Sequence, residues 1–274
     1  MTKAQINARI AKFNSIVEGK AKKIRQAGND SWAPIKKGNE TARVRAFLTK
    51  RNAGIDYLNK NLADELSKDG RVVKFAGVFL HGTPKVNGWT KNPKGPKKLN
   101  GVCELADLQT IFVYLDSGNA IRQMRCVLFQ AKLKADTGTH VIDEPVQRQL
   151  YDKCDGFNYV NNTVAEEGEE RCLPKGTSRK KALQYLFVEH QPPTARTIPS
   201  AQKKGKTSEY GQHLFQFFSN KTGLNTGTKK SAWGKIAWEL MEKVAGKLYT
   251  DKKLRGPGIK GLLKAFNNFE SHKT

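Results

Sequence analysis

Two apolar runs joined by a short turn constrain the fold more than any other part of the chain. Residues 103–116 (CELADLQTIFVYLD) and 121–135 (IRQMRCVLFQAKLKA) are rich in aliphatic and aromatic side chains, and Ser117-Gly118-Asn119 lies between them. This pattern predicts two antiparallel strands that form a hairpin. The hairpin is the predicted centre of the fold.

Helical and strand-like patterns surround the hairpin. The spacing of apolar residues predicts helices over 3–28, 41–49, 55–67, 147–153, 209–219 and 231–249, and further strands over 71–82 and 182–190. Segments 83–100, 161–181 and 194–207 are polar or rich in Lys, Pro and Gly, and are predicted to be loops. A short helical pattern recurs in the tail, 251–274.

This order predicts an α/β protein with a central mixed sheet flanked by helices, and with extra helices at both ends. Three regions are expected. A basic helical extension covers residues 1–50, an α/β core covers 51–200, and a basic helical region packed on the core covers 201–274.

The charge of the chain restricts the class of partner. Lys and Arg number 49 against 25 Asp and Glu, which gives a formal net charge of +24. A small domain needs a net charge of roughly 2–8 for solubility, so this excess favours a polyanionic partner. Double-stranded DNA is the expected partner; an anionic membrane surface and a structural RNA remain alternatives. No segment approaches the roughly 18 apolar residues that a membrane span needs, and no membrane partner is expected.

The cysteines, histidines and tryptophans indicate mainly structural roles. The four cysteines are Cys103, Cys126, Cys154 and Cys172, and no pair has the spacing of a zinc site. Cys103 and Cys126 fall in predicted strands as core residues, and a reducing cytoplasmic location is expected. His81 and His190 end predicted strands, where a structural or surface role is favoured, with a place near the candidate site as the alternative for His81. Trp233 and Trp238 fit the packing face of a helix.

One group of polar residues stands out within the hairpin. Side chains two residues apart in a strand share a face, so Gln130 and Lys132 project together from an otherwise apolar strand. A lysine placed there needs a partner. Asp107 and Glu104 on the preceding strand are the candidates, and an edge of the sheet is where the four would meet.

The arrangement resembles the PD-(D/E)xK nuclease superfamily. The resemblance rests on Glu104-Leu105-Ala106-Asp107 followed by Phe129-Gln130-Ala131-Lys132, and it covers roughly residues 52–190. It implies a restriction-endonuclease-like sheet. It also implies that Asp107, Gln130 and Glu104 hold Mg²⁺ or Mn²⁺, and that Lys132 orients or activates the attacking water. Gln130 stands where a glutamate is usual, and it matches the QxK variant of that superfamily. The chain is most similar to bacterial restriction-like proteins with an ELxD…QAK pattern.

Three supporting residues follow from the same resemblance. A glutamate on the helix before the first core strand is often part of such sites, and Glu65 is the candidate. Gln147 and Tyr151 match the Q-x-x-x-Y pattern of RecB-like nucleases. Positions i and i+4 of a helix share one face, so both side chains can reach the same site.

The expected function is therefore that of a magnesium-dependent nuclease acting on DNA, as an endonuclease of prokaryotic defence. A homodimer or a complex with other defence proteins is a further expectation. The alternative from another class is a basic nucleic-acid-binding protein with a degenerate nuclease fold, which Gln130 supports. A membrane-surface protein that uses the N-terminal helix is a third alternative.

Overall fold

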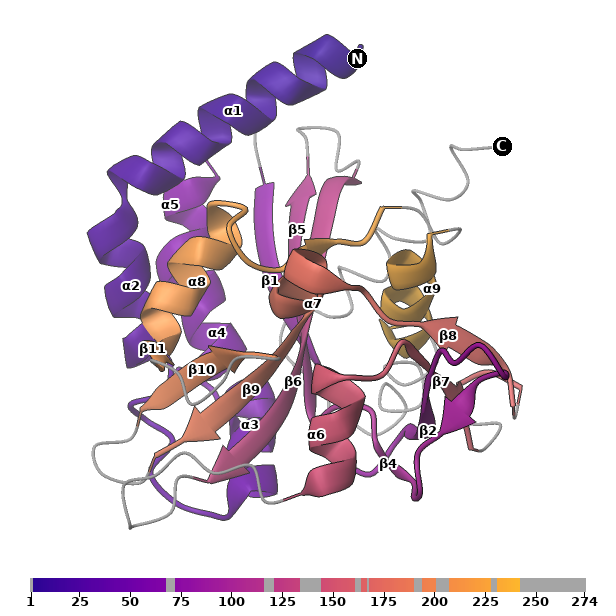
Figure 1. Cartoon of the computed structure of the whole chain (residues 1–274). Helices are drawn as coiled ribbons and strands as arrows, with labels where there is room; N and C mark the ends of the chain where they lie inside the picture. The colour runs from indigo at the N-terminus through magenta and orange to yellow at the C-terminus, as the bar shows by residue number, and fades with distance from the viewer. Residues whose placement is uncertain are drawn as a thin grey trace.

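The chain forms an α/β protein with a mixed central sheet and a second, antiparallel sheet (Figure 1). The computed structural model describes residues 2–67, 72–115, 121–133, 144–160, 164–166, 168–189, 194–200, 207–227 and 231–241. Helices cover one face of the central sheet, and the second sheet lies on the other side of the molecule (Figure 1). The predicted fold class is thus confirmed as α/β with a mixed central sheet.

The central sheet is built around the predicted hairpin. Its strands are β1 (Val72–Phe79), β5 (Leu108–Leu115), β6 (Ile121–Leu133), β9 (Leu183–Val188), β10 (Ala195–Pro199), β11 (Ser208–Glu209) and β12 (Leu224–Asn225). The order is β1-β5-β6-β9-β10-β11, with β12 paired to β6. β5 and β6 are antiparallel, as predicted, and β6 and β9 form the parallel pair.

The alternation of side chains along β6 separates two apolar clusters. Val127, Phe129 and Ala131 face one cluster, which the N-terminal helices cover. Leu128 faces the other cluster, which lies toward the second sheet. Gln130 and Lys132 have the same parity as Leu128, so they project toward the second sheet.

The helices that cover the first cluster come from both ends of the described chain. They are α1 (Lys3–Gly19), α2 (Ala21–Asp30), α3 (Glu40–Thr49), α4 (Gly54–Leu58), the π-helical segment η1 (Asn59–Ala63), α5 (Asp64–Leu66) and α8 (Tyr210–Phe218). The single helix predicted over 3–28 is divided at Lys20 into α1 and α2, and α2 packs against α8. α1 runs in a different direction (Figure 1), and its Phe13 stacks on Phe112 of β5.

The second sheet corrects the prediction of loops. It contains β2 (Lys85–Thr90), β3 (Lys97–Lys98), β4 (Cys103–Glu104), β7 (Gly156–Tyr159) and β8 (Glu170–Cys172). The helices beside it are α6 (Pro145–Asp152), α7 (Gly176–Ala182) and α9 (Ala232–Glu239). The prediction of loops is therefore wrong for the described parts of 83–100 and 161–181. It is also wrong for 194–207, where β10 lies in the central sheet. β2 pairs with the remote β7, and β8 and β10 are strands of only three and five residues, which local composition does not reveal.

Several predictions fall on residues outside the described ranges. They concern the hairpin turn at 117–119, His190, residues 201–206 of the loop predicted over 194–207, the end of the helix predicted over 231–249, and the tail 251–274. The division into regions 1–50, 51–200 and 201–274 stays a prediction. Within the described residues, α2, α3 and α8 bury side chains in one cluster together with β1 and β6.

A pair of glycines allows α2 and α8 to approach closely. A Cβ added to Gly28 would lie 2.5 Å from the Cα of Gly211, and one added to Gly211 would overlap the carbonyl oxygen of Arg25. The interface therefore has no room for a methyl group at either position.

We expect Gly211→Ala to lower the free energy of unfolding by about 1–3 kcal/mol, because the added methyl group must push two packed helices apart. Gly19→Ala is the matched control, since a Cβ at Gly19 meets no atom within 4 Å and alanine favours a helix. Urea denaturation followed by circular dichroism measures both. Equal midpoints for Gly211→Ala and the wild type would contradict the expected effect.

Candidate metal centre

Asp107 lies at a break between two strands. The predicted strand over 103–116 is divided into β4 of the second sheet and β5 of the central sheet, so the expectation of one continuous strand is wrong. The Asp107 N–H donates to the carbonyl of Phe129 at 2.8 Å, and the Asp107 carbonyl accepts the N–H of Leu80 at 2.9 Å. The residue is thus fixed between the end of β1 and the middle of β6.

Both carboxylate oxygens of Asp107 have partners. Oδ2 accepts the N–H of Ala131 at 2.7 Å, and Oδ1 lies 2.9 Å from Nδ1 of His81. The side chain is only 4% exposed, and a carboxylate buried to that extent needs such partners. The first contact extends the bonding of β6 beyond its last residue pair with β5. The second contact directs the other oxygen toward a cleft.

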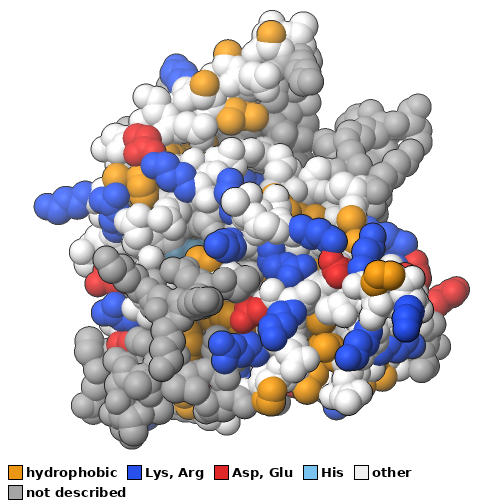
Figure 2. Space-filling view, in the orientation of Figure 1, with side chains coloured by type: hydrophobic (Ala, Val, Ile, Leu, Met, Phe, Trp, Pro, Cys, Tyr) orange, Lys and Arg blue, Asp and Glu red, His pale blue; other side chains and the backbone are white. Residues whose placement is uncertain are grey.

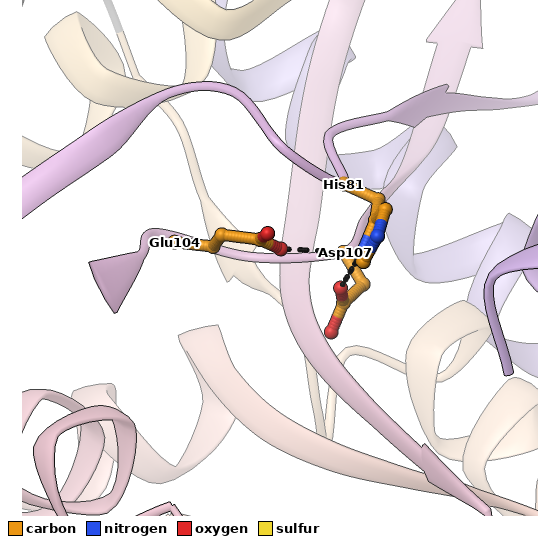
Figure 3. Close-up of side chains that lie close together, drawn as sticks. All are labelled: His81, Glu104 and Asp107. Carbon is orange, nitrogen blue, oxygen red and sulfur yellow. Dashed lines mark hydrogen bonds and ion pairs between the residues drawn. The ribbon is translucent and has the colours of Figure 1, made fainter.

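Three ligand-type atoms converge at this point (Figure 3). Nδ1 of His81, which follows β1, lies 3.2 Å from Oε2 of Glu104 as well as 2.9 Å from Oδ1 of Asp107. One ligand atom from each of these three residues lies within 4.8 Å of the other two. The ends of β1 and β4 and the start of β5 therefore bring a nitrogen and two oxygens together.

The surface around these residues is hollowed into a cleft of about 410 Å³, here called the acidic cleft. The acidic and basic side chains that line it are those of Glu40, His81, Lys85, Glu104, Asp107, Lys132 and Glu144. Four of them are carboxylates, although the chain as a whole carries a net charge of +24. Such a concentration of negative charge favours a cation.

The acidic cleft raises the pKa of two of its carboxyl groups, those of Glu40 and Glu104. The pKa of Glu40 is raised to about 7, mainly by burial and also by the nearby Asp107, while Lys132 and His81 oppose the rise. Burial also raises the pKa of Glu104, and the nearby Asp107 adds to the effect. Both groups would regain their charge if a cation entered the cleft.

His81 is held on both ring nitrogens. Nε2 lies 3.1 Å from Oγ1 of Thr41 at the start of α3, and Nδ1 faces the two carboxylates. The hydrogen bond to Asp107 raises the pKa of His81, and Glu104 adds to this effect. The structure therefore places His81 within the site, whereas its position in the sequence favoured a structural or surface role.

Lys132 reaches the acidic cleft from β6. Its side chain is 14% exposed, and Nζ lies 2.9 Å from Oε1 of Glu144, the residue that precedes α6. Glu144 is largely exposed, so this ion pair is weak and can be exchanged for a ligand. Asp107, Glu104 and Lys132, which the sequence singled out, thus line one cleft.

The remaining candidates of the QxK and QxxxY patterns lie beside or beneath the acidic cleft. Nε2 of Gln130 donates to the carbonyl of Glu104 at 2.8 Å, which ties β6 to β4. Gln147 lines the cleft, and Tyr151 is fully buried behind it. Oε1 of Gln130, Oε1 of Gln147 and the Tyr151 hydroxyl have no hydrogen-bond partner among the described residues. Buried polar atoms without a protein partner are typical of sites that bind a ligand or water.

The structure does not bring Glu65 to this cleft. Its carboxylate pairs with Lys20 and Lys23, each at 2.6 Å, and it lines a separate groove between α2 and the α4–α5 segment. Glu40, at the start of α3, is the helix glutamate that reaches the acidic cleft. The signal in the sequence was the order Asn39-Glu40 before a predicted helix, because this places Glu40 at the helix N-terminus.

Two of the three separations among the ligand atoms match those around a divalent cation, and all three atoms lie within 4.8 Å of one another. Neighbouring ligands of an octahedral ion with bonds of about 2.1 Å are about 3 Å apart. The separations of 2.9 Å and 3.2 Å from Nδ1 of His81 match that value. The carboxylates of Asp107 and Glu104 and the imidazole of His81 are therefore the residues that would hold it, with Glu40 as a further carboxylate at the cleft wall.

The titration of Glu40 gives a test of the cleft without any metal. Folding favours the neutral carboxyl, so the stability that this group contributes is complete below about pH 4.5 and is lost as the pH rises through about 7. Glu40→Gln cannot ionise. Between these pH values, in a chelating buffer, we expect the wild type to lose about 1–3 kcal/mol relative to Glu40→Gln. Urea denaturation across pH measures the difference, and parallel curves would contradict it.

Within the described residues, no helix is both long and apolar enough to cross a membrane. Comparisons of the chain with protein-family models, with curated proteins and with solved structures found no match. The functional argument therefore rests on the geometry of the acidic cleft and on the residues that form it.

Proposed function

We propose that the protein is a nuclease that hydrolyses phosphodiester bonds of DNA with the help of Mg²⁺ or Mn²⁺. One observation carries the proposal: two carboxylates, Asp107 and Glu104, and the ammonium group of Lys132 face one cleft from the start of β5, from β4 and from β6. Phosphodiester hydrolysis needs positive charge at the phosphate and an activated water, and this set of groups provides sites for both.

The arrangement of the central sheet supports the restriction-endonuclease-like type. The β5–β6 hairpin carries Asp107 at its start and Gln130-Ala131-Lys132 near its end, and β9 joins β6 in parallel after α6. This agrees with the mixed sheet that the PD-(D/E)xK resemblance implies. A role in defence against foreign DNA, a homodimer and a cytoplasmic location are predictions that accompany that resemblance.

Each residue has a distinct part in the proposed reaction. A cation held by Asp107, Glu104 and His81 would neutralise charge on the phosphate and lower the pKa of a water next to it. Lys132 would orient that water or stabilise the developing negative charge, and it is free to do so once Glu144 releases it. Gln130 acts indirectly, because its amide holds the backbone of Glu104 in place.

Basic residues beside the acidic cleft fit a nucleic-acid backbone. Lys85 lines the cleft and begins β2, and the hairpin that β2 forms with β3 carries exposed Lys91, Lys94, Lys97 and Lys98. Figure 2 shows further Lys and Arg side chains gathered over the region of α6, α7 and the second sheet. These residues would contact phosphates without reading the base sequence.

The principal test is cleavage of plasmid DNA in the presence of Mg²⁺ or Mn²⁺. We expect Lys132→Ala to lower the rate at least 100-fold, because a group that stabilises charge in the transition state typically contributes about that much. Lys235→Ala is the matched control. Nζ of Lys235 forms a similar ion pair with Oε1 of Glu169, at a distance of 2.7 Å, and neither residue lines the cleft. Agarose gels follow nicking and linearisation. A Lys132→Ala protein as active as Lys235→Ala defeats the nuclease proposal.

The same experiment separates the alternative function. A basic nucleic-acid-binding protein with a degenerate site would bind DNA in a salt-sensitive manner and cut nothing with any divalent cation. The position of Gln130 is the observation that favours it, because its Nε2 is bonded to the Glu104 backbone and Gln130 is not among the described residues that line the cleft.

Cation binding provides a second, independent prediction. An imidazole nitrogen suits Mn²⁺ better than Mg²⁺, which prefers oxygen ligands, so we expect tighter binding of Mn²⁺. Asp107→Asn should weaken Mn²⁺ binding at least tenfold, because it removes the ligand charge while its amide oxygen can still accept the Ala131 N–H. Glu65→Gln should leave binding unchanged. Calorimetric titration with MnCl₂ measures all three proteins, and equal affinities would place the cation elsewhere.

A further inference from the structure

A second cavity, here called the lysine cavity, lies between α7, α8 and β10 and has a volume of about 240 Å³. It shares no lining residue with the acidic cleft. The backbone around it is fixed, because the N–H of Gly223 donates to the carbonyl of Lys181 and thereby joins the segment after α8 to the end of α7. The cavity is therefore a built feature of the fold and independent of the proposed catalytic residues.

The charge of the lysine cavity is positive. Lys180 and Lys181 of α7 and Lys221 after α8 line it, and none of the described residues in its lining is acidic. Nζ of Lys221 lies 3.2 Å from Glu18, but both side chains are more than half exposed, so that contact holds the lysine only weakly. The ammonium groups gathered here favour an anion.

Hydroxyl groups add directional contacts to this charge. The lining includes Thr177, Thr197, Ser208 and Thr222, and Thr222 accepts a hydrogen bond from Nε2 of Gln184 at 2.6 Å, which leaves its own proton to donate. Lysines combined with hydroxyl donors match an oxygen-rich anion better than a single carboxylate.

A buried histidine completes the lining. His213 of α8 is 2% exposed, and its Nε2 has no hydrogen-bond partner among the residues that the structure describes. Its ring packs against Phe129, Tyr210 and Phe217, so it is held rigidly. Burial lowers the pKa of His213 to about 3, so the ring is neutral and has one N–H to donate. A fixed polar ring at the wall of a basic cavity is the second observation that points to a ligand.

We propose that the lysine cavity binds a phosphate monoester group through Lys180, Lys181, Lys221 and the adjacent hydroxyls, with His213 at its wall. A phosphate monoester carries close to two negative charges at neutral pH and three acceptor oxygens, which three ammonium groups and hydroxyl donors can satisfy together. Among the described residues, the cavity lining includes no Phe, Tyr or Trp on which a base could stack, so the phosphate is the recognised part.

Two sources of this group are compatible with the chemistry: the phosphorylated end of a nucleic-acid strand, and free phosphate or a mononucleotide. Calorimetric titration of the full chain distinguishes them. The probes are inorganic phosphate, and a short single-stranded oligonucleotide with either a 5′-phosphate or a 5′-hydroxyl. EDTA in the buffer prevents cleavage, so the outcome does not depend on the nuclease proposal.

We expect saturable binding at one site per chain, and at least tenfold weaker binding in Lys181→Gln and in the Lys180→Gln, Lys221→Gln double variant. Lys153→Gln is the control for a general loss of charge, because Lys153 is an exposed lysine outside the cavity. His213→Phe keeps the ring contacts and removes the nitrogens, and it should weaken binding without unfolding the protein. Thermal unfolding followed by circular dichroism verifies the fold of each variant.

The relative affinities of the three probes show which source supplies the phosphate group. Tighter binding of the 5′-phosphorylated strand than of the 5′-hydroxyl strand identifies a strand end, whereas equal binding of the two strands with lysine-dependent binding of phosphate identifies the free ion or nucleotide. Folded cavity variants that bind every probe as well as Lys153→Gln would overturn it.

Discussion

The structure depends on the way in which Asp107 is held at the break between two sheets. Its main chain bonds to Leu80 and Phe129, and its side chain bonds to Ala131, so one residue connects the end of β1, the start of β5 and the middle of β6. Each bond is buried, and an unpaired buried donor or acceptor costs about 1–3 kcal/mol. The same residue directs one oxygen at His81, so the junction that holds the sheets together also begins the acidic cleft.

Two sites of opposite charge lie in different parts of the protein. Four carboxylates gather in the acidic cleft of a chain whose net charge is +24, and burial raises the pKa of Glu40 to about 7. The lysine cavity, in contrast, is lined by three lysines and a neutral buried histidine. Like charges lie close together in both the acidic cleft and the lysine cavity. Such repulsion is expected at sites that bind ligands of opposite charge.

Much of the central architecture was predictable because it follows from periodicity. The alternation of side chains in 103–116 and 121–135 specified a hairpin, and the helical spacing specified α3, the α4–α5 segment, α6 and α8. The predicted loops at 83–100, 161–181 and 194–207 were wrong, because they contain the short strands β2, β8 and β10. β2 pairs with β7, which is remote in sequence, whereas β8 and β10 pair with strands next to them in the chain. Glu104 and Asp107 were predicted on one strand, yet they reach the cleft from two sheets.

The sequence by itself determined the class of fold and the hairpin, and it singled out Asp107, Glu104 and Lys132, which line one cleft. Alternation along β6 explains only why Gln130 and Lys132 share a face. Only the tertiary structure decided that His81 and Glu40 join them and that Glu65 does not. The physical reason is that these residues lie at the ends of helices and strands. Their positions depend on how whole elements pack against one another, and no local pattern records that packing.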